Sequence, residues 1–407
     1  MNNIEALMLA IQLFFLYMTA RQSMLKMVTM IFLLFPLYWQ YFSLIYLQSG
    51  GYSSELDFYG KETSAALFLL LLIQLAIFII CISSIGKVKK GQARMIGVMP
   101  VSVRFFVLAL ASLLVTVLLA YGITNSFPVF SGTHRFDYWF HQKYDLRIVF
   151  GWFYFIAIGL GFFLREKPRT IIIILLIYTV LLILYSNKFT LIFYTLLYFM
   201  FGVFLRQDVV PHKFWWILGC VLAFPLLLLT GWASANGVMS YLFGDWFVDR
   251  ALGNQGHFFY IANNYPGRLS FRELFGGQEL AINALMYEFS KTSFVNGIIE
   301  KGFRFSGIFP AILIFLYGKI GAAIIFSIII SAIIPVLRII RYMLFRGSLV
   351  GYLAAAKLFG FLQIILAGSF DEVFLNGVFW GILVILMFLG LLYGFAGKVR
   401  CSEGYNS

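Results

Sequence analysis

Long apolar runs separated by short polar stretches dominate the sequence. The run TIIIILLIYTVLLILY (170–185) is continuous and lacks the alternation of a lipid-facing β-strand. Many runs reach the length that a helix needs to cross a bilayer, so they predict an all-α polytopic membrane protein with about 11 (10–12) transmembrane helices. The expected spans lie near residues 4–20, 27–47, 63–85, 105–124, 148–164, 170–186, 189–205, 214–231, 319–337, 349–368 and 374–397.

The segment FPAILIFLYGK (309–319) is apolar but short for a span. Counting it as a twelfth span would move the basic cluster RIIRYMLFR (338–346) to the opposite side of the membrane. We therefore expect an interfacial or re-entrant helix on the outer side, ended by the glycine pair Gly318 and Gly321.

Basic clusters set the expected topology. KVKKGQAR (87–94), REKPR (165–169) and RIIRYMLFR are short and basic, as cytoplasmic loops usually are. Alternating the spans from the 86–104 loop puts the N-terminus outside and the C-terminus inside. The segments then assigned to the cytoplasm hold only three acids, Glu166, Asp208 and Glu403. The charges therefore sort as the positive-inside rule requires.

Composition agrees with this class. The chain is 62% hydrophobic, 19% aromatic and 12% charged, whereas a soluble domain is about a quarter charged. The formal charge of +13 follows the membrane loops, so we interpret it as topology and not as nucleic-acid binding. Cys81, Cys220 and Cys401 form neither a disulfide framework nor a metal motif. The start, MNNIEALMLAIQLFF, lacks a basic segment and a clear cleavage site, and is expected to be a retained first span.

Three segments on the expected outer face carry most of the remaining polar residues: 49–62, 125–147 and the long interval 232–306. The last is rich in aromatic residues, unlike a disordered linker, so we expect it to be ordered. No internal repeat is visible, which argues against a transporter built from inverted halves. The expected divisions are an N-terminal bundle (1–231), an outer loop with interfacial helices that carries the chemistry (232–318), and C-terminal transmembrane helices (319–407).

Motifs for nucleotides and metals are absent from the sequence. There is no GxxxxGK[ST], no GxGxxG after a strand, no HExxH and no CxxC. A chemical function would therefore use a substrate that is already energised, and the sequence gives no reason to expect a metal or another cofactor.

The stretch RALGNQGHFFYIANN (250–264) is the strongest candidate for a site. If it is helical, Arg250, Asn254 and His257 lie on one face, since positions i, i+4 and i+7 fall within a narrow arc. Gln255 falls off that stripe. The alternative is an ordinary solvated face.

Other cations stand at apolar boundaries. Lys188 occupies the tight turn in SNKFTL, Arg304 precedes the short apolar segment in KGFRFSGIFPA, and Arg135 lies between His134 and His141 in SGTHRFDYWFHQKYD. Snorkelling or an aromatic belt would explain each of them without a site. Lys357 lies within an expected span, where a charge tends to mark a pathway or a buried pair; a snorkelling lysine near the cytoplasmic surface is the rival interpretation.

These cations suit a diphosphate, because Arg gives bidentate contacts and Lys a point charge. A neutral His or a carboxylate can accept a proton from a sugar hydroxyl. The carboxylates expected on the outer side include Glu288, Glu300 and Asp371, each of which is more typical of a surface acid or an ion-pair partner than of a base.

The bundle with one long outer interval resembles the Wzy-type O-antigen polymerases of bacterial inner membranes. RALGNQGH (250–257) is similar to an Arg…Gln-Gly stretch of their loops, and SNKFTL and GFRFSGIFPAIL (302–313) look like recurring segments of the family. The resemblance implies a GT-C-like, metal-independent glycosyltransferase in the inner membrane, with its active site facing the periplasm. It would join oligosaccharide repeat units carried on undecaprenyl diphosphate. Membrane lipids and a chain-length regulator are the further partners that it implies.

The resemblance also implies roles for residues. Arg250 would hold the diphosphate, and His257 would contact it or deprotonate the acceptor, with Glu288 as a further catalytic candidate. Gln255 would orient the sugar and Gly256 would allow a close approach. Lys188, Arg304 and Arg135 would complete the cationic surroundings. Two other functions stay open: an O-antigen ligase that uses the same donor, and a flippase or transporter of lipid-linked sugars.

Overall fold

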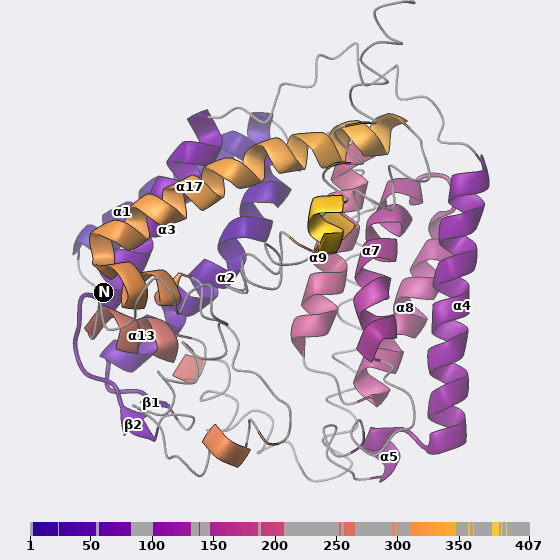
Figure 1. Ribbon diagram of the computed structural model, residues 1–407, viewed down its shortest axis with the longest axis horizontal. Helices are drawn as coiled ribbons and strands as arrows, with labels where there is room; N and C mark the ends of the chain where they lie inside the picture. The colour runs from indigo at the N-terminus through magenta and orange to yellow at the C-terminus, as the bar shows by residue number, and fades with distance from the viewer. Residues whose placement is uncertain are drawn as a thin grey trace, which may run out of the picture.

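The computed structural model describes residues 3–22, 24–53, 57–82, 101–131, 147–185, 189–206, 256–264 and 310–346, with short pieces at 138, 252–253, 295–297, 300, 357–358, 361, 377–381, 384 and 388. Within these residues the protein is mostly helical and has one two-stranded sheet (Figure 1). Segments Ala65–Ile82, Val103–Ser131 and Tyr317–Pro335 of the described chain are long and apolar enough to cross a membrane. The helical class expected for a membrane protein is thus present.

The first group of elements contains α1 (Asn3–Gln22), α2 (Met24–Gln48), the hairpin of β1 (Tyr52–Ser53) and β2 (Phe58–Tyr59), and α3 (Ala65–Ile82). Helix α2 ends in a Schellman motif: the Gly51 amide donates to the Tyr46 carbonyl and the Gly50 amide to the Leu47 carbonyl, each at 3.0 Å. Gly50 takes the left-handed conformation that this cap requires, with φ of 91°. The cap turns the chain into the hairpin, in which Tyr52 faces Tyr59.

The second group contains α4 (Val101–Asn125), α5 (Pro128–Ser131), α7 (Arg147–Phe163), α8 (Pro168–Leu184) and α9 (Phe189–Arg206). Arg104, near the start of α4, forms a 2.7 Å ion pair with Glu166 in the α7–α8 turn. At the other end, the Tyr185 hydroxyl donates to the Leu118 carbonyl at 2.6 Å. The start of α4 therefore lies with the α7–α8 turn and its end with the α8–α9 turn, as the alternating topology predicted.

Helices α13 (His257–Asn264) and α17 (Ala311–Arg346) complete the described elements. Gly318 breaks α17 with a non-helical conformation, at φ 69° and ψ 179°. The predicted helix end at this glycine is confirmed. Ala311 to Phe315, just before the break, are at most 3% exposed, so they do not form an interfacial helix lying on the protein surface. The re-entrant alternative stays a prediction.

Beyond the break, α17 runs across the top of the view in Figure 1, from the α1–α3 group toward the α7–α9 group. It continues as one helix to Arg346, so the basic cluster 338–346 belongs to a helix. The expectation of a loop there is wrong, since these Arg, Leu, Ile and Met residues favour helix and no glycine or proline follows Pro335 within the helix. The predicted span 214–231 lies outside the described residues, and most of spans 349–368 and 374–397 does too; the residues described within these two spans are helical.

Glycines bring α7 and α9 into close contact. A Cβ atom on Gly202 would collide with the carbonyl of Ile158, and one on Gly161 would collide with the carbonyl of Phe199 and lie 2.9 Å from the Val203 nitrogen. Small residues at such positions let helix backbones approach, which is how membrane helices gain packing energy. Tyr178 and Phe153 reinforce the same bundle by stacking at 3.5 Å between ring centroids.

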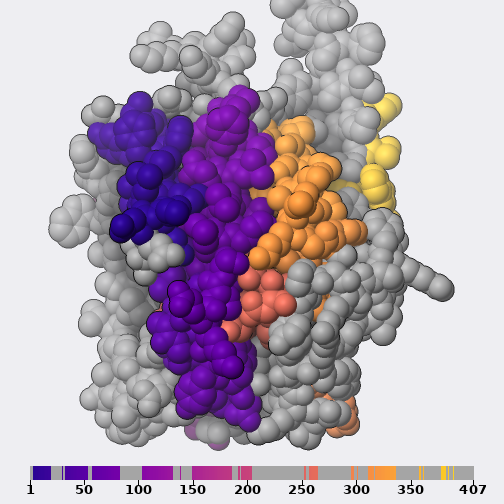
Figure 2. Space-filling view, turned by 90° about the vertical axis from the view of Figure 1, so that its left-hand side faces the viewer, coloured from indigo at the N-terminus to yellow at the C-terminus, as the bar shows by residue number. Residues whose placement is uncertain are grey.

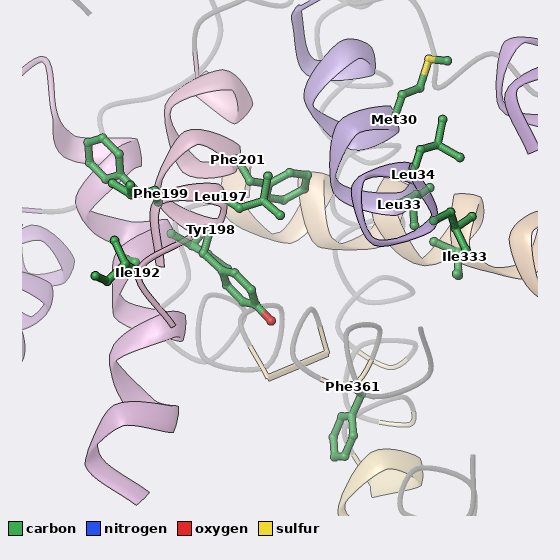
Figure 3. Packing of buried hydrophobic residues seen from close by; sticks show 14 of the residues in the cluster. Met30, Leu33, Leu34, Ile192, Leu197, Tyr198, Phe199, Phe201, Ile333 and Phe361 are labelled. Carbon is green, nitrogen blue, oxygen red and sulfur yellow. The ribbon is translucent and has the colours of Figure 1, made fainter. Parts of the chain in front are cut away.

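Helices α2 and α9 contact each other, and α17 contributes to the same hydrophobic core. Leu33 and Leu34 of α2 lie beside Ile333 of α17, and Phe201 of α9 points toward α2 (Figure 3). This contact joins the two groups of helices.

Helix α1 buries polar side chains and exposes apolar ones, which is the reverse of a helix in a soluble protein. Of its described side chains, the buried ones are Glu5, Gln12 and Thr19, spaced seven residues apart. Its outward face is apolar: Leu7 and Leu13 are 62% and 63% exposed. Gln12 accepts a 2.6 Å hydrogen bond from the Tyr38 hydroxyl and donates to the Leu70 carbonyl at 3.1 Å. An apolar outside and a paired polar inside suit a helix that faces lipid.

Candidate functional site

Helix α13 sits at the end of the molecule where α2 enters the hairpin. It contacts α2, α3 and α17, and Figure 2 shows it between α3 and α17 on this face. Every side chain from His257 to Asn263 is buried, and only Asn264 is exposed. A short helix in the candidate segment is therefore seated among the transmembrane helices.

Ser43 of α2 fastens the turn that precedes α13. Its hydroxyl accepts a 2.6 Å hydrogen bond from the Gly256 amide and donates one to the Leu252 carbonyl. One serine side chain thus satisfies two backbone groups of the incoming chain. Because Leu252 and Gly256 flank positions 253–255, the bridge holds both ends of that stretch against α2.

Gly256 permits this contact because it has no side chain. A Cβ atom there would lie 2.8 Å from the Ser43 hydroxyl oxygen and 2.9 Å from the Gln40 carbonyl oxygen. The close approach expected at Gly256 therefore occurs toward α2 in this structure. An approach of a sugar to the same glycine stays a prediction.

The hairpin covers α13 through Tyr260. The Tyr260 hydroxyl accepts a 2.8 Å hydrogen bond from the Lys61 amide and donates to the Lys61 carbonyl at 3.2 Å. The rings of Tyr260 and Phe58 lie 5.3 Å apart, and those of Phe259 and Phe68 6.3 Å apart. The backbone of Lys61 therefore lies beside α13, and the side chains of Lys61 and Glu62 are exposed.

His257 is the first residue of α13 and is completely buried, with its ring 4.2 Å from that of Phe258. Leu252 and Gly253 form a π-helical turn and Gly256 a bend, so α-helical geometry starts only at His257. The condition for the predicted stripe, a continuous α-helix through 250–264, is not met, because the chain bends at Gly256 to meet Ser43. The predicted alignment of Arg250 and Asn254 with His257 does not follow from helical periodicity.

Lys319 adds a cation next to α13. It follows the Gly318 break, its Nζ atom donates a 3.2 Å hydrogen bond to the Ser64 hydroxyl, and it lies 5.9 Å from the centre of the Phe68 ring. Lys61 and Lys319 were not singled out in the sequence. Lys61 lies in an exposed polar segment like many others, and only its proximity to Tyr260 distinguishes it.

The turn that contains Lys188 is framed by described helices. Tyr185 ends α8, and its ring contacts those of Phe127, Tyr138 and Phe150 at 5.2, 6.2 and 5.6 Å. Burial, together with the nearby Tyr121, raises the pKa of Tyr138 to about 12. Its hydroxyl therefore stays neutral at physiological pH. The aromatic cluster packs around Tyr185, the last described residue before Lys188.

Most of the predicted site residues lie outside the described part of the chain. They are Arg135, Lys188, Arg250, Gln255, Glu288 and Arg304, together with His134, His141 and Asp371. Glu300 is described and exposed. Among the described residues no three His, Cys, Asp or Glu side chains come together as a metal site would require.

Lys357 lies among aromatic rings. Its Nζ atom is 6.0 Å from the ring centre of Trp152, 5.3 Å from that of Phe155 and 5.4 Å from that of Phe361. Trp152 lies in the first half of α7 and Phe155 at its middle, so this contact lies between the two ends of the helix. The pathway or buried-pair interpretation of this lysine and its rival, snorkelling to the cytoplasmic surface, both stay predictions.

Comparison with known proteins gives one match. Residues 276–379 are similar to a family of unknown function, DUF6418. Neither a curated protein nor a solved structure matches the chain.

Proposed function

We propose that the protein is an O-antigen polymerase, a glycosyltransferase of the bacterial inner membrane that joins lipid-linked oligosaccharide repeat units at the periplasmic face. The donor is a growing glycan on undecaprenyl diphosphate, and the acceptor is one repeat unit on the same lipid. The acceptor hydroxyl oxygen forms a bond to the anomeric carbon of the donor. The bond from that carbon to the diphosphate breaks, undecaprenyl diphosphate leaves with the electron pair, and the hydroxyl proton passes to a base.

Support comes from the way Ser43 fastens the candidate segment. Its two hydrogen bonds hold Leu252 and Gly256 at the end of α2, next to the hairpin. The predicted diphosphate ligand Arg250 is two residues from Leu252, and the predicted sugar ligand Gln255 directly precedes Gly256. A polymerase needs such groups at a fixed height at the membrane surface, where the lipid diphosphate lies.

Cations near α13 strengthen this assignment. The exposed Lys61 lies beside Tyr260, and Lys319 lies at the Gly318 break. Positive groups that stand ready around a departing diphosphate lower the barrier, because they stabilise charge that grows in the transition state. In the proposal, Arg250, Lys188, Arg304 and Arg135 supply the remaining positive charge.

His257 can act on a substrate only after a conformational change. Its side chain is fully buried between α13 and the neighbouring helices, so it reaches a substrate only if α13 shifts or the acceptor enters beside it. The base is therefore His257 after such a movement, or Glu288.

A strain deleted for this gene tests the proposal. Lipopolysaccharide and lipid-linked glycan would be separated on gels after complementation with an empty vector, the wild-type gene or the Arg250→Ala variant. A core that carries one repeat unit, with the ladder restored only by the wild-type gene, supports polymerisation.

The other outcomes contradict it in distinct ways. Long glycan kept on undecaprenyl diphosphate, with bare core, indicates a ligase. Repeat units trapped on the cytoplasmic leaflet indicate a flippase, and an unchanged ladder excludes all three functions. A correctly inserted Arg250→Ala protein that still makes full-length polymer removes the central role of Arg250.

A further inference from the structure

Lys357 is a cation that the described protein surrounds with rings but does not neutralise. Trp152, Phe155 and Phe361 each present a ring within 6.0 Å of its Nζ atom. Within the part of the chain that the structure describes, the one ion pair joins Arg104 to Glu166, and none includes Lys357. Aromatic faces attract a cation through their quadrupole, but they carry no net charge.

The rings belong to separate segments that come together around the lysine. Trp152 and Phe155 are one helical turn apart on α7, with ring centroids at 5.9 Å. Phe361 follows Lys357 by four residues and contacts Phe379, which in turn contacts Trp380, each at 5.3 Å. Residues four apart share a helix face, so Lys357 and Phe361 present one surface to α7. The packing of Phe361 and Lys357 against α7 therefore forms the environment of this lysine.

The aromatic surroundings open outward. Lys357 itself is partly exposed, Trp152 is 47% exposed and Trp380 is 50% exposed. Among the described residues that follow Phe361 in the sequence, Val378, Val384 and Phe388 are also exposed and apolar. In a membrane such a surface faces lipid chains, where an ammonium group has no water to solvate it.

The ring contacts on α7 define the depth of Lys357 in the bundle. Trp152 lies five residues beyond Arg147, about 7.5 Å along the axis of α7, and Phe155 lies about 12 Å along it. The start of α7 is at the end of the bundle that the topology places outside. A lipid diphosphate therefore reaches this ammonium if it is drawn roughly 10 Å below the outer end of α7, into the span.

We propose that Lys357 and its three rings form a lipid-side subsite for the diphosphate of a polyisoprenyl lipid. The ammonium binds phosphate oxygens with its three N–H donors, and the rings hold it in place and pack against the first isoprenoid units. This inference rests on the proposed function, which supplies a lipid diphosphate as the substrate. It adds a contact on the transmembrane helices to those expected from the outer loop.

Equilibrium binding tests the subsite. The full-length protein in phosphatidylcholine nanodiscs would be titrated with radiolabelled undecaprenyl diphosphate. Lys357→Met keeps the length of the side chain and removes its charge; Lys357→Arg keeps the charge; Lys167→Met is the matched control, because Lys167 is exposed in the α7–α8 turn at the other end. We expect Lys357→Met to bind about tenfold more weakly, Lys357→Arg to stay within about threefold of the wild type, and the control to be unchanged.

Competitors identify the chemical group. Undecaprenol without phosphate, inorganic diphosphate and phosphatidylglycerol should each compete much more weakly than the lipid diphosphate. If undecaprenol or phosphatidylglycerol competes equally well, recognition of a lipid diphosphate is excluded. Equally strong competition by inorganic diphosphate excludes the contribution of the isoprenoid chain.

Failure of the inference differs from failure of the proposed function. A Lys357→Met protein that binds as tightly as the wild type overturns the subsite and leaves the polymerase standing. A wild-type protein that binds no lipid diphosphate overturns both. Since Met is more apolar than Lys, the substitution favours membrane insertion, and gel filtration of each variant checks that it is folded.

Discussion

The hydroxyl of Ser43 and the amide of Gly256 lie 2.6 Å apart, although 213 residues separate them in the sequence. The same hydroxyl donates to the carbonyl of Leu252. A single polar side chain within an apolar helix thus determines where the chain returns from its long loop and begins α13.

Replacing Ser43 with Ala should weaken the attachment of Leu252 and Gly256 to α2. The substitution leaves the Gly256 amide and the Leu252 carbonyl without their partner, and each buried unpaired group costs roughly 1–3 kcal/mol. We expect a lower thermal unfolding temperature in detergent and a weaker polysaccharide ladder. Ser49→Ala is the control, because the Ser49 hydroxyl is exposed and bonds only locally, to the Tyr46 carbonyl at 2.7 Å. Equal effects of the two substitutions would contradict the bridging role.

Gly256→Ala should have a similar effect for a steric reason. The added Cβ atom would lie 2.9 Å from the Gln40 carbonyl, which is part of the α2 backbone and cannot rotate away. We expect a destabilisation of roughly 1–3 kcal/mol, typical of overpacking. Gly297→Ala is the matched control, since a Cβ atom on Gly297 meets nothing within 4 Å. Thermal unfolding of the two variants side by side measures the difference.

Gly202→Ala should separate α7 from α9. The new methyl group would collide with the carbonyl of Ile158, so the two helices must move apart and lose their packing. We expect a much lower yield of folded protein after detergent extraction, followed by gel filtration. Gly151→Ala lies on the same helix pair but in open space and should be neutral or slightly stabilising. Normal folding of Gly202→Ala would show that the helices are farther apart than in this structure.

The hydrogen bond between Gln12 and Tyr38 should stabilise the packing of α1 against α2. A double-mutant cycle with Gln12→Leu and Tyr38→Phe isolates their 2.6 Å hydrogen bond. Interhelical bonds in membrane proteins contribute about 0.6 kcal/mol on average and up to about 1.7 kcal/mol, and we expect a coupling in that range. Gln12→Leu and Thr116→Ala should be additive, because the Thr116 hydroxyl bonds within its own helix to the Ser112 carbonyl. A coupling free energy of zero between Gln12 and Tyr38 would show that their hydrogen bond does not stabilise α1.

Local patterns were sufficient to predict most of the long helices of the described chain. Apolar runs predicted α1 to α4 and α7 to α9 nearly to their ends, since burial in lipid and the backbone's own hydrogen bonds both demand a helix there. The glycine pair also predicted the break at Gly318. Neither inference required knowledge of a distant partner.

The site was less predictable because it depends on contacts between distant segments. Nothing near Ser43 in YFSLIY indicates that its hydroxyl binds the chain at Leu252 and Gly256. His257 was read as part of a polar stripe, whereas tertiary packing buries it completely. The rings around Lys357 come from a helix about 200 residues earlier as well as from its own. Single-chain periodicity cannot reveal such pairings.

The predicted orientation of the molecule can be tested by cysteine labelling. Ser49 and Lys167 are both exposed, Ser49 at the end of α2 beside the hairpin and Lys167 in the α7–α8 turn. In a background in which Cys81, Cys220 and Cys401 are replaced by Ser, each position is changed to Cys in turn. A membrane-impermeant maleimide should label Ser49→Cys in sealed spheroplasts and should label Lys167→Cys only after the membrane is opened. The basic clusters 87–94 and 165–169 lie on the Lys167 side in the predicted topology, which is why that end is expected to face the cytoplasm. The reverse labelling pattern would place α13 and the Ser43 bridge in the cytoplasm, where a periplasmic polymerase could not use them.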